Sequence, residues 1–153
     1  MDDTTVVYYT SNREDVAFEA RIKRSLLHAS RGLPIISVSQ KPIGLGENIC
    51  VGDVGHSSRN IFRQMEVGAK AAKTRYVCPA ESDTIYPKEY FSFVPPRDDV
   101  FYIASPLYVC FHQRGYKRYF APKPRGSESA MVCNRELLLS RLKIMLSNGP
   151  EWS

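Results

Sequence analysis

Runs of apolar residues in the first forty positions alternate between strand-like and helix-like spacing. The stretch from Thr4 to Thr10 is rich in β-branched and aromatic residues and predicts a buried strand. Ser11 and Glu14 have the spacing of a capping box, which would open a helix. The apolar stripe of that helix consists of Phe18, Ile22 and Leu26. A second apolar run at 33–38 completes a predicted right-handed parallel βαβ unit.

A glycine-rich stretch precedes a second helix and a third strand. Residues 40–55 contain glycines with apolar residues between them, which predicts a long ordered loop. Ser57 or Ser58 can cap the helix. Its predicted core face consists of Ile61, Met65, Gly68 and Ala72. The small residues Gly68 and Ala72 would let the helix pack close to a sheet. The next apolar run, 75–79, predicts the third strand.

The second half of the chain is predicted to be less regular. Pro87 can open a short helix. Strands are predicted at residues 100–104, 107–112 and 116–120, the last two as a hairpin. A loop is predicted at 121–129, and a final helix from about Ala130 carries Leu138, Leu142 and Met145 on one face.

Composition fits one soluble α/β domain that spans residues 1–153. Hydrophobic residues make up 43% and charged residues 24%, both ordinary values for a globular protein. Apolar runs are far shorter than the roughly 20 residues of a membrane span, and the acidic start does not have the pattern of a secretion signal, so a cytoplasmic protein is expected. Cys78 and Cys110 lie in apolar runs and are predicted to be reduced core residues. The formal charge of +5 permits an anionic partner such as a nucleotide or nucleic acid.

Two acidic residues follow the third predicted strand directly. Glu81 and Asp83 are two positions apart, so at a strand end their carboxylates point to the same side. Carboxylates this close repel unless a cation or hydrogen-bond donors lie between them. A divalent cation that bridges to a diphosphate would satisfy both. An ordinary surface loop is the alternative, because acid-x-acid triplets are frequent.

The order of these segments resembles the GT-A fold of nucleotide-sugar glycosyltransferases, a three-layer α/β/α arrangement with a mostly parallel central sheet. The stretches Phe62-Arg63-Gln64-Met65 and Ala80-Glu81-Ser82-Asp83-Thr84-Ile85-Tyr86-Pro87 resemble small phage and bacterial GT-A-like proteins related to the base J glucosyltransferase. Members of that group often have His between the two acids, where this chain has Ser82. The chain is also short for a GT-A enzyme.

The resemblance implies a role for each of several residues. Thr10, Ser11 and Asn12 would contact the nucleoside, although Ser11 and Asn12 can equally well cap the first helix. Arg59, at the start of the second helix, would bind the diphosphate, or it is a solvated helix arginine. Lys41 and His56 border the glycine-rich loop and rank below Arg59.

The acidic residues would then hold the metal. Asp83 is the expected ligand of Mg²⁺ or Mn²⁺, and Glu81 would reach the ribose or a water of the metal shell. His112 could complete the coordination shell or act on the acceptor, although a lone histidine in a strand is more often structural. The sequence does not separate the carboxylates that could act as catalytic base, which are Asp98, Asp99, Glu128 and Glu136.

Three functions remain open at this level. The first is a metal-dependent glycosyltransferase that uses a nucleotide-sugar, most simply a uridine diphosphate sugar, with a hydroxylated base in DNA as one acceptor. The second is nucleotidyl transfer, which is disfavoured because Thr10-Ser11-Asn12-Arg13 lacks the glycines of a phosphate loop. The third is a non-catalytic GT-A-like module that binds a nucleotide, a glycan or nucleic acid, with basic residues near the 121–129 loop contacting phosphates.

Overall fold

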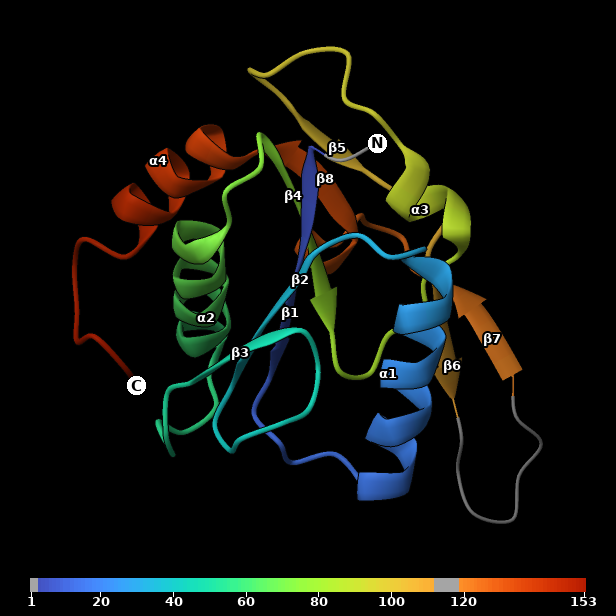
Figure 1. The fold of residues 1–153 in the computed structure, drawn as a ribbon, viewed down its shortest axis with the longest axis horizontal. Coiled ribbons are helices and arrows are strands. Elements are labelled where there is room, and N and C mark those ends of the chain that lie inside the picture. The colour runs from blue at the N-terminus through green and yellow to red at the C-terminus, as the bar shows by residue number, and fades with distance from the viewer. Residues whose placement is uncertain (1–2, 112–118) are drawn as a thin grey trace.

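A six-stranded, mostly parallel sheet forms the centre of the protein. The computed structural model describes residues 3–111 and 119–153. The strand order is β3-β2-β1-β4-β8-β5; β3, β2, β1 and β4 are mutually parallel, and β8 is antiparallel to both neighbours (Figure 1). These strands are β1 (Thr4–Thr10), β2 (Ile35–Ser39), β3 (Glu47–Cys50), β4 (Tyr76–Glu81), β5 (Phe101–Ile103) and β8 (Met131–Asn134). The predicted α/β class with a mostly parallel sheet is confirmed.

Helices cover both faces of this sheet, which gives three layers (Figure 1). The helices are α1 (Val16–Ala29), α2 (Ser58–Ala71), α3 (Lys88–Ser92) and α4 (Arg135–Met145), with a single 3₁₀ turn, η1, at Glu128–Ala130. Side chains of α1 and α3 pack with Val6 and Tyr8 of β1 in one apolar cluster. Side chains of α2 and α4 pack with Val7 and Tyr9 in a second. The alternation of β1 residues between the two clusters is the two-residue period of a strand covered on both sides.

The first helix begins later than the capping box predicts. Asp15 is the N-cap, and its side chain accepts a hydrogen bond from the Phe18 amide at 2.9 Å. Asn12 has a positive φ of 55°, so the chain turns between β1 and α1 and Ser11 cannot occupy the cap position. The prediction that Ser11 caps this helix is therefore wrong.

Two strands were not predicted. β3 lies inside the stretch expected to be a loop, and pairs with β2 in parallel from Glu47 to Cys50. β8 precedes the last helix, where a helix start was expected, and its Met131, Val132 and Cys133 are buried between β4 and β5. Short apolar runs fit a strand or a helix equally well, and only the sheet neighbours distinguish the two.

A separate hairpin connects β5 to η1. It consists of β6 (Tyr108–Phe111) and β7 (Tyr119–Pro122), which pair antiparallel and do not join the central sheet. The predicted pairing is confirmed for the described residues, and β7 ends at Pro122, two residues later than expected. Cys110, predicted to be a core residue, is exposed, whereas Cys78 is buried.

Helix α2 lies close to the sheet because of Gly68. A Cβ at this position would overlap the Cγ1 methyl of Val7 and lie 3.2 Å from a methyl of Val38. The absence of a side chain thus brings α2 against β1 and β2, as the small residues of this helix predicted.

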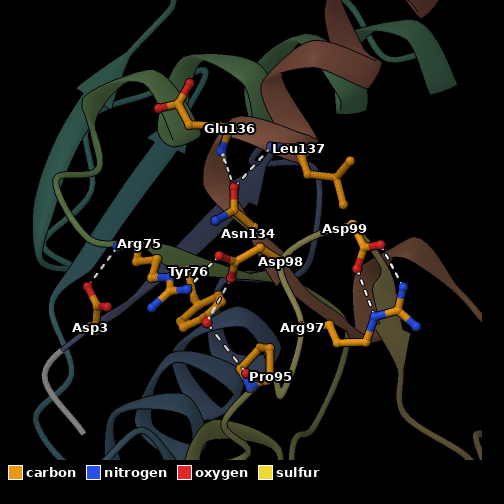
Figure 2. A network of polar contacts seen from close by, with 10 residues as sticks. All are labelled: Asp3, Arg75, Tyr76, Pro95, Arg97, Asp98, Asp99, Asn134, Glu136 and Leu137. Atoms are coloured by element: carbon orange, nitrogen blue, oxygen red, sulfur yellow. Dashed lines mark hydrogen bonds and ion pairs between the residues drawn. The ribbon is translucent and has the colours of Figure 1, made fainter.

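Polar contacts join the amino ends of β1 and β4, at the edge of the sheet opposite the carboxyl ends of these strands (Figure 2). The Arg75 guanidinium pairs with Asp98 at 2.5 Å, and the Tyr76 hydroxyl donates to the same carboxylate at 2.9 Å. The Asn134 side chain caps α4 at the amides of Glu136 and Leu137. None of the helices in the described part of the chain is long and apolar enough to span a bilayer.

Gly46, which leads into β3, provides a stability test. Its φ is +58°, and a Cβ there would overlap the backbone carbonyl oxygen of Ile35. Gly46→Ala is expected to lower the free energy of unfolding by about 2–5 kcal/mol, from backbone strain plus overlap. Gly32→Ala is the control, since Gly32 has a φ of +82° but open space around it, and should lose only about 1–2 kcal/mol. Urea unfolding measures both; equal losses would show that the overlap does not matter.

Candidate functional site

A pocket of about 340 Å³ opens at the carboxyl ends of β1 and β4. Its walls come from the end of β1, the start of α2 with the loop before it, and the residues that end β4. The lining residues are Tyr9, Thr10, Ser11, Glu14, Gln40, Gly55, His56, Ser57, Ser58, Asn60, Ile61, Gln64, Glu81, Ser82 and Asp83. The connection that follows β1 passes to one face of the sheet and the one that precedes β4 to the other, so the pocket lies at a topological switch point, where open α/β sheets bind ligands.

On the β1 side, the predicted nucleoside contacts separate into two groups. Thr10 and Ser11 line the pocket. Asn12 lies outside the lining residues, and its Oδ1 accepts hydrogen bonds from the backbone amides of Gln40 at 2.9 Å and Lys41 at 2.8 Å. Asn12 therefore ties the end of β1 to the end of β2, a structural role that differs from the expected nucleoside contact.

Two buried amide side chains hold α2 against this edge. Gln64 is 2% exposed and donates through Nε2 to the carbonyl oxygens of Thr10 and Val38, at 3.0 and 3.1 Å. Asn60 is 1% exposed and donates to the carbonyl of Val54 at 2.7 Å. Sequence analysis missed both, although polar residues on an otherwise apolar helix face were a visible signal.

The start of α2 forms the opposite wall. Ser57 is the N-cap, and its Oγ accepts from the Asn60 amide at 3.1 Å, so the cap predicted at Ser57 or Ser58 is confirmed. Ser57 and Ser58 line the pocket together with His56. Free amides and hydroxyls at a helix start favour an anionic group.

Arg59 has a different role from the predicted one. Its guanidinium donates three hydrogen bonds to backbone carbonyls of the C-terminal segment: Nε to Pro150 at 2.7 Å and the terminal nitrogens to Asn148 and Leu146 at 2.9 and 3.0 Å. It does not line the pocket. The reason is geometric: at about 100° per residue, Asn60, Ile61 and Gln64 share the side of α2 that faces the pocket, which directs Arg59 away from it.

Three carboxylates, from Glu14, Glu81 and Asp83, face the pocket, which places the predicted pair together. Burial and the neighbouring Asp83 carboxylate raise the pKa of Glu81, opposed in part by the hydroxyls of Ser129 and Tyr9. Burial, then Asp83 and Glu19, also raise the pKa of Glu14. Glu14 was interpreted as part of a capping box, so sequence analysis missed it as a pocket residue. The site is rich in negative charge and would gain from a cation.

A buried hydroxyl also belongs to this pocket. Tyr9 is 3% exposed and lines the pocket next to Glu81, its register partner in β4. Its hydroxyl lies close enough to the Glu81 carboxylate to oppose the rise in the pKa of that group, but within the described residues no hydrogen bond of normal geometry joins it to a partner. Burial and the Glu81 charge raise the pKa of Tyr9 well above the usual value, so the hydroxyl stays protonated. A ligand oxygen in the pocket would therefore offer this hydroxyl an acceptor of better geometry.

Tyr86 fixes the end of β4. Its hydroxyl accepts a hydrogen bond from the Glu81 amide at 3.0 Å and donates to the Ser129 carbonyl at 2.7 Å. The rings of Tyr86, Tyr90 and Phe91 contact one another in the core. The packed rings of these three residues therefore hold Tyr86, and through its hydroxyl the acidic end of β4, in place.

The predicted metal ligands are only partly placed. His112 lies outside the described residues. Within residues 3–111 and 119–153, no group of three His, Cys, Asp or Glu side chains is arranged to hold a metal ion. Mg²⁺ is commonly held by one or two carboxylates together with substrate phosphates, so the pair formed by Glu81 and Asp83 fits an ion that arrives with its ligand.

Comparisons with known proteins concern the fold alone. No family model matches the chain, and no curated protein is significantly similar in sequence. The fold is similar to that of the bifunctional IspDF from Campylobacter jejuni, with a TM-score of 0.56 and 11% identity. The alignment covers 97% of this chain and 45% of that one, so this chain spans less than half the length of the IspDF chain.

Asn12 tests the link between β1 and β2. Asn12→Ala removes the acceptor of two backbone amides and is expected to lower the free energy of unfolding by about 1–3 kcal/mol. Asn12→Asp keeps the acceptor oxygens and tolerates the positive φ, so it should remain close to the parent protein. Urea unfolding of both variants measures the difference. Equal stability of the two would contradict a structural role for this oxygen.

Glu81 tests the electrostatics of the pocket. Because its pKa is raised in the folded protein, the carboxylate opposes folding as the pH rises above the usual glutamate pKa and up through the folded value. Glu81→Gln should therefore match the parent near pH 4 and become the more stable protein toward pH 7, the gap widening by at most about 1.4 kcal/mol per pH unit. Urea unfolding across this range measures the gap. Glu47→Gln, which removes an exposed carboxylate, is the control, and the same pH trend in both variants would contradict a special environment at Glu81.

Proposed function

We propose that this protein is a metal-dependent, GT-A-like glycosyltransferase that moves a sugar from a nucleotide-sugar to an acceptor hydroxyl. The observation that supports it best is the pocket at the switch point, where Glu81 and Asp83 face the start of α2 across a space of about 340 Å³. This volume falls in the range of small-molecule sites, which begins at about 300 Å³. Carboxylates on one wall and a helix start on the other suit a metal-bridged diphosphate.

The charge of the pocket makes the proposed metal dependence strict. None of the described residues that line it is Lys or Arg, while three are acidic. A diphosphate placed beside these carboxylates would be repelled, and Arg59 is engaged by the C-terminal segment. A divalent cation between the carboxylates and the phosphates would reverse this repulsion. We therefore expect a nucleoside diphosphate to bind weakly or not at all without a metal.

The proposed roles follow the position of each side chain. Asp83, the more exposed acid, would hold Mg²⁺ or Mn²⁺, and Glu81 would contact the ribose or a water of the metal shell. His112 stays a proposed further ligand. Thr10 and Ser11 would lie against the nucleoside, and the hydroxyls of Ser57 and Ser58 against phosphate oxygens.

In such a reaction the acceptor oxygen bonds to the anomeric carbon, the bond from that carbon to the diphosphate oxygen breaks, and the acceptor proton passes to a base. A bound divalent ion would supply charge neutralisation on the departing diphosphate. Of the carboxylates considered as base, Asp98, Asp99 and Glu136 belong to the contacts at the amino ends of the strands, away from the pocket (Figure 2). Of that set Glu128 remains. The structure adds Glu14, which lines the pocket and whose pKa is raised by burial, the direction that a base working near neutral pH needs.

The acceptor we propose is a hydroxylated base in DNA, which the formal charge of +5 supports. A non-catalytic module that binds a nucleotide, a glycan or nucleic acid is the second candidate. The engagement of Arg59 favours it, because the cation expected to contact the diphosphate is absent from the described pocket wall.

Thermal unfolding with uridine diphosphate, with and without Mn²⁺, tests the proposal. A ligand at about 100 times its Kd adds about 2.7 kcal/mol, or roughly 5–10 °C for a chain of this size. We expect that shift only when nucleotide and metal are both present, and we expect Asp83→Asn to abolish it.

Asp99→Asn is the matched control, because Asp99 pairs with Arg97 at the other edge of the sheet. It should keep the full shift. A shift that survives Asp83→Asn and needs no metal would favour the binding module, and no shift with any nucleoside diphosphate would refute the transferase.

A further inference from the structure

The hairpin of β6 and β7 exposes its side chains on both faces. Seven of its eight residues are exposed, and the two strands pair only with each other. A two-stranded hairpin is at best marginally stable in water without a surface to pack on. Its exposed fractions are high for aromatic side chains: 62% for Tyr108, 44% for Phe111, 59% for Tyr119 and 69% for Phe120.

These aromatic residues form open stacking surfaces. Phe111 and Tyr119 are register partners, and their rings stack with centroids 4.9 Å apart and planes inclined by 16°. Tyr108 and Phe120 belong to the opposite face by the alternation of each strand. Several exposed aromatic side chains on one small element are typical of an interaction site.

The hairpin and the connections on either side of it account for the whole net charge of the protein. Residues 100–127 contain five Lys or Arg and no Asp or Glu, so the rest of the chain has sixteen basic and sixteen acidic residues. The five are Arg114, Lys117, Arg118, Lys123 and Arg125, of which the first three lie outside the described residues and enter here by sequence alone. Lys123 and Arg125 directly follow β7 and are exposed.

We propose that the β6–β7 hairpin binds single-stranded nucleic acid, with bases stacked on its aromatic rings and phosphates near Lys123 and Arg125. Aromatic rings interleaved with basic side chains are the shared chemistry of surfaces that bind single strands. A second copy of the chain would bring two strongly basic segments together, which is unfavourable. A membrane-surface element requires its apolar side chains on one face, whereas this hairpin has them on both. The inference rests on the hairpin alone and does not depend on the proposed transferase.

The hairpin is attached at the same sheet edge as the pocket. Its first connection leaves β5 after Ile103, where the Ala104 amide donates to the Ala130 carbonyl at 2.8 Å. Its return passes Gly126, whose Cα lies so close to Ile103 that an added Cβ would overlap the Ile103 side chain. It then reaches Ser129, which Tyr86 links to Glu81. A single-stranded nucleic acid bound along the hairpin would thus approach the acidic end of β4.

Fluorescence anisotropy with a labelled oligothymidylate tests this, in the absence of nucleotide and metal. Tyr119→Ala/Phe120→Ala should weaken binding by about 5- to 150-fold for each stacked base lost, while Tyr119→Phe should bind as the parent does. Lys123→Gln/Arg125→Gln should reduce the slope of log K against log salt concentration by about 1.4. Arg141→Gln/Lys143→Gln removes two exposed charges on α4 and is the matched control. It should change this slope by less than half as much as the hairpin variant does.

Other results would overturn the proposal. These are absence of binding at low salt, equal losses in the hairpin and α4 variants, or preference for duplex DNA over the single strand. Binding of phosphatidylserine vesicles without binding of the oligonucleotide would assign the hairpin to membranes. Self-association that is lost in Tyr119→Ala/Phe120→Ala, again without oligonucleotide binding, would assign it to a second copy. Thermal unfolding of each variant checks that the fold is retained, and because the pocket is unchanged in all of them, nucleotide binding can fail or succeed independently.

Discussion

The parallel pairing of β1 with β4 is the constraint on which the site depends. These strands are distant in sequence, yet Tyr9 lies opposite Glu81 in their register, and this fixes which polar groups meet at the carboxyl edge. The pairing is buried on both faces and fastened at its amino end by Asp3, Arg75 and Asp98. A shift of one residue in this register would move Glu81 to the other face of the sheet. The meeting of the Tyr9 hydroxyl and the Glu81 carboxylate in the pocket follows from this alignment.

Around that alignment, polar side chains have structural roles, and two of them, Asn12 and Arg59, were expected to bind a ligand instead. Asn12 and Gln64 satisfy backbone groups at the ends of β1 and β2. Arg59 holds the C-terminal segment. Buried backbone amides and carbonyls need partners, and the nearest side chains supply them, which removes those side chains from chemistry. The groups left facing the pocket are mainly carboxylates and hydroxyls, which is why the proposed diphosphate would need a cation beside it.

Sequence analysis predicted the elements with strong local signals and missed those defined by neighbours. The βαβ start, the Ser57 cap and the acidic strand end have recognisable residues at fixed spacing, and the structure confirms them. β3 and β8 have only short apolar runs, and their identity as strands comes from β2, β4 and β5 beside them. Glu14 appeared to cap a helix because spacing cannot reveal that Asn12 turns the chain first. The role of Arg59 depended on its direction around the helix and on a partner about ninety residues later.

Tyr86 joins the end of β4 to the segment that returns from the hairpin. One hydroxyl oxygen contacts both the backbone at Glu81 and the backbone at Ser129, just after the hairpin returns to the sheet. The backbone at the acidic end of β4 is therefore tied to η1 through one oxygen atom. A displacement of η1 would be passed to the backbone at Glu81, because the two segments cannot move apart without breaking one of these hydrogen bonds.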